Sequence, residues 1–324
     1  MKKKEKGRVI KENWDEVSIV KKQKHLKVDR ILLVIFCLLS IIAIIVMIDN
    51  IIKELRIKDA EKKEISQLEQ LEAKKEAEEK RLEEEQRQKE LEEQEKISKR
   101  YNPLNEEEFD KMNKIYGHSD KKRIFLTFDD GPTKSVTPYI LNLLKEENVK
   151  ANFFVLGMRV EQNPDLVKRE FDEGHFIGNH SYSHKYSKIY ESIDSLFDEY
   201  NRTNNAIKSA VQNDKYNSIV FRFPGGLAGG KYNDMKHEAA QKLKEQGIAN
   251  VDWNALTKDA EGAKTKEDLM NNFIETIQNK TSIVLLMHDA ADKILTYEVL
   301  PDIIKYCKEN GYEFQTMFDA IGRE

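Results

Sequence analysis

Residues 124–132 read IFLTFDDGP, and this stretch decides the fold of the chain around it. Ile124–Phe128 is a short apolar run of the kind that forms a buried strand. Gly131 and Pro132 end that strand, so the carboxylates of Asp129 and Asp130 follow at its carboxyl end. In barrels and open sheets of parallel strands, the active site lies at the carboxyl ends of the strands. The stretch therefore predicts a buried strand that places two acidic side chains at the carboxyl ends of the strands, where an active site is expected.

The chain around this strand alternates strand and helix patterns over about 200 residues. The β-rich runs that predict strands are Ile124–Phe128, Asn152–Leu156, Phe176–Asn179, Ile219–Phe223, Asn250–Trp253, Ile283–Met287 and Glu313–Thr316. The stretches with helical period are Thr137–Glu147, Pro164–Glu173, Tyr190–Val211, Asn233–Gln246, Lys266–Asn279 and Leu295–Asn310. This alternation predicts an α/β domain of about seven mainly parallel strands, long enough to bury a full core.

Polar side chains follow the other predicted strands as they follow the first. They are His180 and His184 after the third, Arg222 after the fourth, Asp252 and Asp259 after the fifth, and His288 after the sixth. Two imidazoles and one carboxylate are a ligand set for zinc, cobalt or nickel, so the pattern suggests metal-assisted hydrolysis. The structural alternatives are a turn or helix cap for the two adjacent aspartates and a structural role for each histidine.

Charge is distributed unevenly along the 324 residues, whose formal net charge is −4. Residues 1–30 carry a net +6, residues 31–52 a net −1, residues 53–100 a net −2 and residues 101–324 a net −7. A uniform soluble domain is excluded, and so is a nucleic-acid binder, because the only basic patch is at the N-terminus. Two cysteines exclude a disulfide scaffold.

Residues 31–52 predict a transmembrane helix. Ile31–Ile48 contains 18 residues with no charge and is apolar on every face, unlike the amphipathic helix of a soluble core. A cleaved signal peptide fits less well, because the run is long and has no small-residue cleavage site. The basic residues of the 1–30 tail favour a cytoplasmic N-terminus. We therefore expect a single-pass cell-membrane protein whose larger part is extracytoplasmic.

Residues 53–100 predict a charged helical spacer. The segment has no Gly or Pro and is rich in good helix formers, with pairs such as Glu76 and Lys80 four residues apart. Its apolar residues do not keep a steady heptad spacing. We expect a solvated single helix or a weak coiled coil, which would allow weak self-association of the chain.

The motifs along residues 120–320, taken together, resemble those of a known family. They are TFDDGP at 127–132, HSYSH at 180–184, RFPGG at 222–226, DWN at 252–254 with Asp259 downstream, and LLMHD at 285–289. In this order and spacing they are similar to the five motifs of the NodB-type polysaccharide deacetylases, carbohydrate esterase family four. The resemblance implies a distorted (β/α) barrel over 101–324 that removes acetyl groups from sugars with one divalent metal ion, zinc before cobalt or nickel. It is strongest toward membrane-anchored peptidoglycan N-acetylglucosamine deacetylases of Gram-positive bacteria.

Roles follow from the resemblance, motif by motif. It implies that Asp130, His180 and His184 bind the metal. It implies that Asp129 is the general base and that His288 is the general acid that protonates the leaving amine.

The remaining implied roles concern support and substrate contact. Arg222 is expected to keep Asp129 ionised, and either Asp252 or Asp259 to orient Arg222, with Asp259 preferred. The resemblance also implies that the Gly225 N–H stabilises the oxyanion and that Leu286 lines the pocket for the acetyl methyl group. Trp253 is expected either to line the sugar groove or to pack in the core.

Two features depart from the family pattern. Gly225 and Gly226 stand where an aromatic residue often follows the proline, which leaves that wall of the groove in question. Leu256 stands at a position that some relatives give to aspartate.

The main hypothesis is deacetylation of N-acetylglucosamine in peptidoglycan at the outer face of the membrane. The alternative substrates are poly-N-acetylglucosamine, chitin oligomers, N-acetylmuramic acid and acetylxylan. A catalytically inactive, membrane-anchored scaffold is the alternative from another class. The presence of every predicted ligand, base and acid argues against it.

Overall fold

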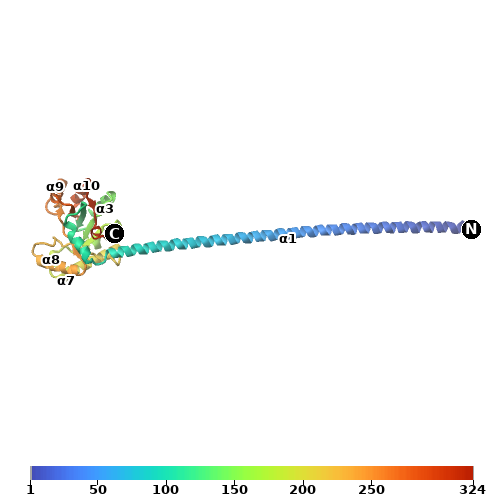
Figure 1. The fold of residues 1–324 in the computed structure, drawn as a ribbon, viewed down its shortest axis with the longest axis horizontal. Coiled ribbons are helices and arrows are strands. Elements are labelled where there is room, and N and C mark those ends of the chain that lie inside the picture. The colour runs from blue at the N-terminus through green and yellow to red at the C-terminus, as the bar shows by residue number, and fades with distance from the viewer. Residues whose placement is uncertain (1, 324) are drawn as a thin grey trace. The chain divides into compact units, whose positions relative to one another are not determined.

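The structure is a computed structural model that describes residues 2–323, with the side chains of residues 16–96 and 99–323. The chain divides into two units, residues 1–88 and residues 89–324. We call the second one the α/β unit. Figure 1 gives the order of the elements along the chain by colour.

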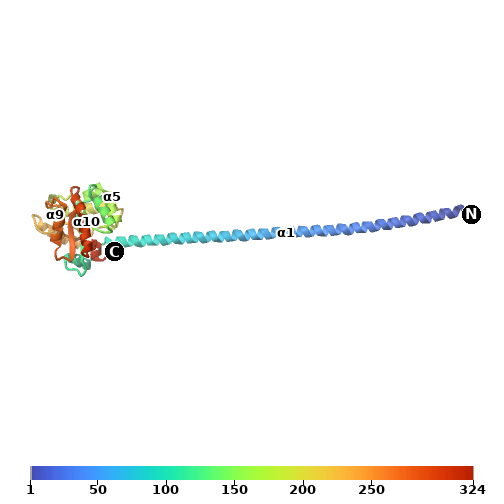
Figure 2. The same ribbon diagram turned by 90° about the horizontal axis from the view of Figure 1, so that it is seen from above.

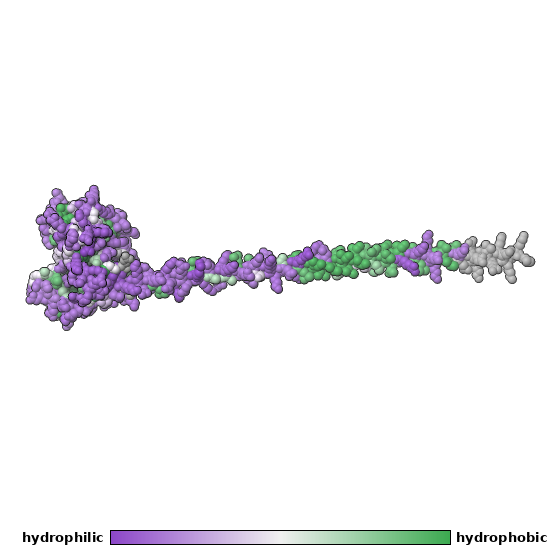
Figure 3. Space-filling model, in the orientation of Figure 1, coloured by the Kyte–Doolittle hydropathy of each residue, from purple (hydrophilic) through white to green (hydrophobic). Residues whose placement is uncertain are grey.

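Helix α1 (Lys2–Arg100) includes both the predicted apolar segment and the predicted charged segment. It is one helix without a break at residue 52, so the boundary predicted there is a change of composition within a helix. The expected ion pair between Lys80 Nζ and Glu76 Oε1 is present at 2.8 Å. Figure 3 shows the apolar stretch of α1 as a continuous hydrophobic band. Within the described residues, α1 is the one helix long and apolar enough to cross a membrane, by length and composition alone.

The α/β unit contains short parallel strands joined by helices. The strands are β1 (Arg123–Asp129), β2 (Asn152–Val155), β3 (Phe176–Asn179), β4 (Val220–Phe221), β5 (Ala249–Asn250), β6 (Ala255–Leu256), β7 (Ser282–His288) and β8 (Glu313–Phe314). The helices are α2 (Glu106–Asn113), a 3₁₀ helix (Lys114–Tyr116), α3 (Thr137–Glu146), α4 (Gly157–Gln162), α5 (Pro164–Asp172), α6 (Tyr186–Ile189), α7 (Ile193–Val211), α8 (Asn233–Glu245), α9 (Lys266–Ile277), α10 (Ile294–Glu309) and α11 (Met317–Ile321). In Figure 2, α9 and α10 lie next to each other.

The sheet has the strand order β5-β4-β3-β2-β1-β7-β6, and every pair in it is parallel. β7 pairs with the whole length of β1, whereas β2 pairs with its end and β8 with its start. β5 and β6, at the two ends of this order, are separated by only the four residues 251–254. The chain itself therefore links the two edges of the curled sheet.

The predicted fold class is confirmed: the α/β unit is a distorted (β/α) barrel whose sheet path contains seven strands. The six predicted helices are present, with ends that differ by at most three residues. The strand predicted at Asn250–Trp253 is wrong in its extent, since β5 covers Ala249–Asn250 only. β6 was not predicted, because a two-residue strand is too short to show a periodicity.

Burial explains why β1 has the central place. Six of its seven residues are buried, as expected for a parallel strand covered on both faces. The core around it contains the rings of Phe125, Phe128 and Phe153. This packing fixes the carboxyl end of β1, where Asp129 and Asp130 stand.

Candidate active site

The two adjacent aspartates at the end of β1 have different surroundings. Asp129 is the last residue of the strand and is buried. Asp130 has a φ of 74°, in the left-handed region that L-residues rarely adopt, so the chain turns sharply between the two side chains. In an extended strand, successive side chains point to opposite faces. The turn at Asp130 instead lets both carboxylates approach His180.

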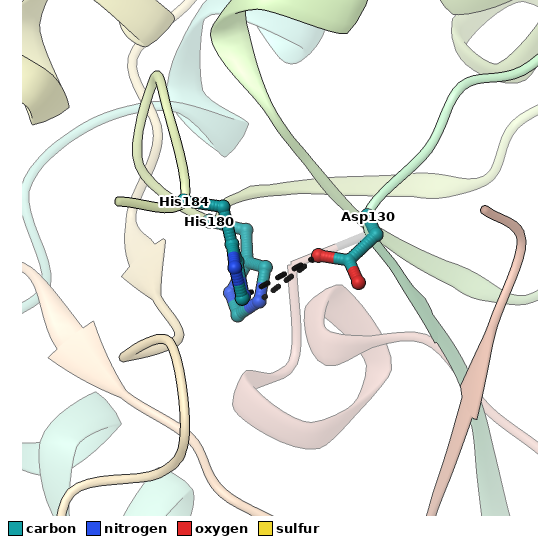
Figure 4. Close-up of side chains that lie close together, drawn as sticks. All are labelled: Asp130, His180 and His184. Atoms are coloured by element: carbon teal, nitrogen blue, oxygen red, sulfur yellow. Dashed lines mark ion pairs between the residues drawn. The ribbon is translucent and has the colours of Figure 1, made fainter. Parts of the chain in front are cut away.

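Asp130, His180 and His184 form a group that could hold a metal ion. Their ligand atoms all lie within 4.8 Å of one another. Asp130 Oδ1 is 3.7 Å from His180 Nε2 and 3.5 Å from His184 Nε2, and Figure 4 shows both rings directed at this carboxylate. The same Oδ1 atom is buried and has no hydrogen-bond partner among the described residues. A buried carboxylate oxygen facing two imidazole nitrogens is the donor set that a divalent first-row metal requires, so these residues fit the ion.

His180 is held in the tautomer that suits a ligand. Its Nδ1–H donates to the carbonyl oxygen of Arg222 at 2.8 Å, which leaves the Nε2 lone pair facing Asp130. Burial lowers the pKa of His180 to about 3, although the nearby charge of Asp130 acts in the other direction. The imidazole is therefore neutral at physiological pH, as metal binding requires.

Arg222 is buried and contacts Asp129, the predicted base. Its side chain is fully buried, and its guanidinium lies 3.9 Å from the centroid of the Phe154 ring. Nη1 donates to Asp129 Oδ1 and to Thr127 Oγ1, both at 2.8 Å. Burial raises the pKa of Asp129, while the charge and hydrogen bond of Arg222 oppose the rise. Arg222 thus supplies the positive charge that lets a buried carboxylate ionise.

Asp259 does not orient Arg222, so that prediction is wrong. Arg222 is instead oriented by backbone carbonyls: Nε donates to Val251 O at 2.9 Å and Nη2 to Asp252 O at 3.0 Å. The Asp252 carboxylate accepts from the Leu227 N–H. Backbone carbonyls in the β5–β6 connection therefore orient Arg222, the role that was expected of a carboxylate.

Asp259 lies against His288. Its Oδ1 is 2.9 Å from His288 Nδ1, and its Oδ2 accepts from the His288 backbone N–H at 2.8 Å. Burial disfavours the charged imidazole, but the hydrogen bond and charge of Asp259, with further help from Asp129 and Asp130, raise the pKa of His288 to about 9. His288 is therefore protonated at neutral pH, with its Nδ1–H engaged and its Nε2–H available for transfer.

The three residues expected to contact substrate lie on the loop after β4, in the β5–β6 connection and on β7. Gly225 has a φ of 77°, and among the described residues no group accepts a hydrogen bond from its N–H. Trp253 is partly buried against the core, with its ring 5.9 Å from the Arg222 guanidinium. Leu286 lies on β7 opposite Thr127 of β1 and is 8% exposed.

Glu199 is a positioning residue that the sequence reasoning missed. This fully buried carboxylate on α7 accepts from the backbone N–H groups of Tyr182 at 2.9 Å and Ser183 at 2.6 Å. Its Oε1 lies 3.0 Å from Lys188 Nζ. Tyr182 and Ser183 form the turn between His180 and His184, so Glu199 fixes the distance between the two imidazoles. Nothing in the spacing of a glutamate on a distant helix signals this contact.

Asp289 is a second residue whose contacts the sequence did not reveal. It is buried, its N–H donates to Asp129 O at 3.1 Å, and its Oδ2 accepts from Thr137 Oγ1. A Cβ at Gly131 would lie 2.0 Å from Oδ2, so the carboxylate needs glycine there. Burial raises the pKa of Asp289 to about 7. Asp289 thus connects the end of β7 to the turn that follows β1.

Comparison with known proteins agrees with this geometry. The family model described as polysaccharide deacetylase matches residues 116–248. A peptidoglycan-N-acetylglucosamine deacetylase of Bacillus cereus is 33% identical over 216 residues, which are 63% of this chain and 74% of that protein. A protein of the same description from Listeria monocytogenes is 34% identical over 232 residues, 70% of this chain but only 44% of that protein. A solved CE4 esterase from Streptococcus mutans superposes with a TM-score of 0.59 at 31% identity, covering 68% of this chain and 93% of that one.

The chain therefore belongs to the polysaccharide deacetylase family. It is an enzyme of this family, and the two curated relatives are named as deacetylases.

Proposed function

We propose that the protein hydrolyses the N-acetyl group of N-acetylglucosamine residues in peptidoglycan, with one divalent metal ion. The observation that supports the proposal is that two sets of side chains lie together at the carboxyl end of β1. A ligand set of Asp130, His180 and His184 stands next to a carboxylate, Asp129, that is held by a buried arginine. The names of the relatives support peptidoglycan as the substrate class.

The metal ligands are Asp130, His180 and His184, and zinc is the ion we propose. A divalent ion held there acts as a Lewis acid on the acetyl carbonyl and makes the attacking water more acidic. Cobalt and nickel share the preference for imidazole and carboxylate, so they are the ions to compare with zinc.

Asp129 is the general base in this proposal. Its Oδ2 is 3.6 Å from His180 Nε2, so the carboxylate stands next to the ligand set, while its Oδ1 is held by Arg222. The arginine fixes the orientation of the carboxylate and keeps it available to take the proton of the attacking water.

His288 is the general acid. Its proton on Nε2 passes to the nitrogen of the leaving amine as the amide C–N bond breaks, and the Asp259 carboxylate stabilises the imidazolium before that transfer. Arg222 opposes the rise that burial causes in the pKa of Asp129, and the raised pKa of His288 keeps its imidazole protonated, as a base and an acid require.

Three further residues complete the proposed site. The Gly225 N–H has no acceptor among the described residues and is the proposed donor to the oxyanion of the tetrahedral intermediate. Leu286 is proposed to contact the acetyl methyl group, and Trp253 to line the sugar groove.

The decisive experiment is mass spectrometry of acetate loss with the metal-loaded full chain in detergent. Defined muropeptides are compared with oligomers of chitin and poly-N-acetylglucosamine and with acetylxylan. We expect a mass decrease of one acetyl group on the N-acetylglucosamine of muropeptides. Loss of acetate from the muramic acid unit, or faster deacetylation of another glycan, would make that sugar or glycan the substrate instead. No acetate from any glycan would favour the inactive scaffold.

We also propose that residues 31–52 anchor the protein in the cell membrane as a single span, with residues 1–30 in the cytoplasm. The α/β unit is then extracytoplasmic, where peptidoglycan is found, and residues 53–100 serve as a spacer with at most weak self-association. Support comes from the apolar stretch of α1 and the basic tail before it. In membrane vesicles of known orientation, a protease added to the face that was outside the cell should digest the chain after residue 53. If the α/β unit were protected from this protease, the proposed orientation in the membrane would be wrong.

A further inference from the structure

The loop after β4 has no side chain where a wall of the groove would stand. Gly225 and Gly226 have φ angles of 77° and 76°, which favour glycine. A Cβ at Gly225 would lie 2.5 Å from the Tyr186 hydroxyl oxygen and 3.1 Å from Cζ of the same ring. The space beside Gly225 is therefore filled by Tyr186, a residue from the segment that follows His184.

Tyr186 is the first of a row of rings that leads away from the metal ligands. Its ring centroid is 5.5 Å from that of His184 and 5.7 Å from that of Tyr190, and the Tyr190 ring is 5.2 Å from that of Tyr232. A cavity of about 230 Å³ adjoins this row and is lined by Tyr186, Tyr190, Gly225, Lys231 and Tyr232, among others. At ~30 Å³ for each water, the cavity has room for about eight waters, which is comparable with one sugar ring.

Tyr190 and Tyr186 differ in their burial and in the hydrogen bonding of their hydroxyl groups. The Tyr190 hydroxyl donates to Pro224 O at 2.7 Å, and its side chain is buried, so it supports the loop. Tyr186 is 42% exposed, and its hydroxyl has no hydrogen-bond partner among the described residues. A partly exposed aromatic ring whose hydroxyl has no hydrogen-bond partner suits a ligand with an apolar face and a polar rim.

We propose that Tyr186 binds the sugar unit next to the one that loses its acetyl group, and so selects for a glycan chain over a single sugar. The inference rests on the proposed function, because the neighbouring sugar is defined by the reacting one. Sugar rings present C–H groups on one face and hydroxyls at the edge, which match the partly exposed ring and free hydroxyl of Tyr186. The absence of a side chain at Gly225 makes room for the Tyr186 ring beside the loop.

The test compares Tyr186→Ala and Tyr186→Phe with Tyr139→Ala, a matched control at an exposed tyrosine on α3 outside the cavity. The substrate is the tetramer of N-acetylglucosamine, and the full chain is used with zinc. We expect Tyr186→Ala to lower kcat/KM about tenfold through a higher KM, from the apolar contact that is lost. Tyr186→Phe should recover most of it, and the control should equal the wild type.

A zinc titration separates binding from disturbance of His184. Unchanged zinc affinity in Tyr186→Ala, together with a raised KM, supports the inference. An unchanged KM would overturn it, and so would a loss in kcat that follows a loss of zinc.

Calorimetry with the tetramer covers the case in which the wild type releases no acetate. It compares Asp129→Asn with the double variant Asp129→Asn/Tyr186→Ala. Weaker tetramer binding in the double variant would show that Tyr186 contacts the glycan chain even where the proposed function fails. Equal binding would reject the inference itself.

Discussion

His180 and His288 are the same residue type at the same edge of one barrel, yet their surroundings give them opposite charge states. His180 donates its Nδ1–H to a backbone carbonyl, and burial lowers its pKa to about 3. His288 has a carboxylate, Asp259, at the equivalent nitrogen, and despite burial its pKa rises to about 9. Burial keeps the His180 imidazole neutral even though its carbonyl partner and nearby carboxylate favour the charged form, whereas the Asp259 carboxylate keeps His288 charged despite burial.

The difference fits the roles proposed for the two residues. A metal ligand must be a neutral imidazole, whereas a general acid must carry a proton that it can give away. Burial of one ring and a carboxylate beside the other therefore give both forms at a single pH. The predictions below change one side of this comparison at a time, from the largest expected effect to the smallest.

Removing His180 should have the largest effect. His180→Ala deletes one of three ligands, so we expect zinc affinity to fall by at least ~10²-fold and acetate release to be lost at ordinary zinc concentrations. Zinc content by mass spectrometry and acetate release are measured on the same sample. His237→Ala, at an exposed histidine on α8, is the control. A variant that keeps full zinc content would remove His180 from the ligand set.

Changing the carboxylate behind His288 should have the next largest effect. Asp259→Asn removes the charge that raises the His288 pKa, so the imidazolium loses its proton at a lower pH. We expect the high-pH limb of kcat/KM to move to lower pH, with a loss of about 10²-fold at pH 8. Asp292→Asn, at an exposed aspartate nearby, should leave the pH profile unchanged. An unshifted limb in Asp259→Asn would mean that His288 is not the acid.

The same pair predicts how stability depends on pH. The His288 pKa is about 9 in the folded chain and about 6.5 when unfolded. Its contribution is therefore fully present below about pH 6.5 and is lost as the pH rises through about 9. Denaturant midpoints of the wild type should fall over this range more steeply than those of His288→Gln. Equal slopes would contradict the raised pKa.

The smallest effect is expected at Glu199, which acts on His184 only through the turn it holds. Glu199→Gln weakens two hydrogen bonds to backbone N–H groups, so we expect zinc affinity to fall about tenfold with kcat little changed at saturating zinc. Glu191→Gln, at an exposed position in the same region, is the control. A thermal unfolding curve checks that the variant is folded. A variant with normal zinc affinity would limit Glu199 to a structural role.

The parts of the site that follow a strand directly were predictable. Asp130, His180 and His184 stand within a few residues of strands with clear apolar runs, so the sequence alone places them at one edge. Asp259 lies in a long connection between β6 and α9, and its partner is chosen by how that connection folds back. The sequence showed a carboxylate in the right motif but did not show whether it faces Arg222 or His288.

Arg222 illustrates a second limit. The family resemblance implied that a carboxylate orients it, but the structure provides carbonyl oxygens of Val251 and Asp252. Backbone acceptors are present in every sequence, so no residue type marks them. The apolar helical segment was easier to predict, because it rests on composition over 18 residues rather than on a single contact.

The central claim is that Asp129 and Asp130, neighbours in sequence, have separate roles as base and ligand. Zinc content and acetate release of Asp129→Asn, measured together on the full chain, test it most directly. We predict zinc content equal to that of the wild type and a loss of acetate release of about 10³-fold or more. Loss of zinc in Asp129→Asn, or acetate release at the wild-type rate, would contradict the account.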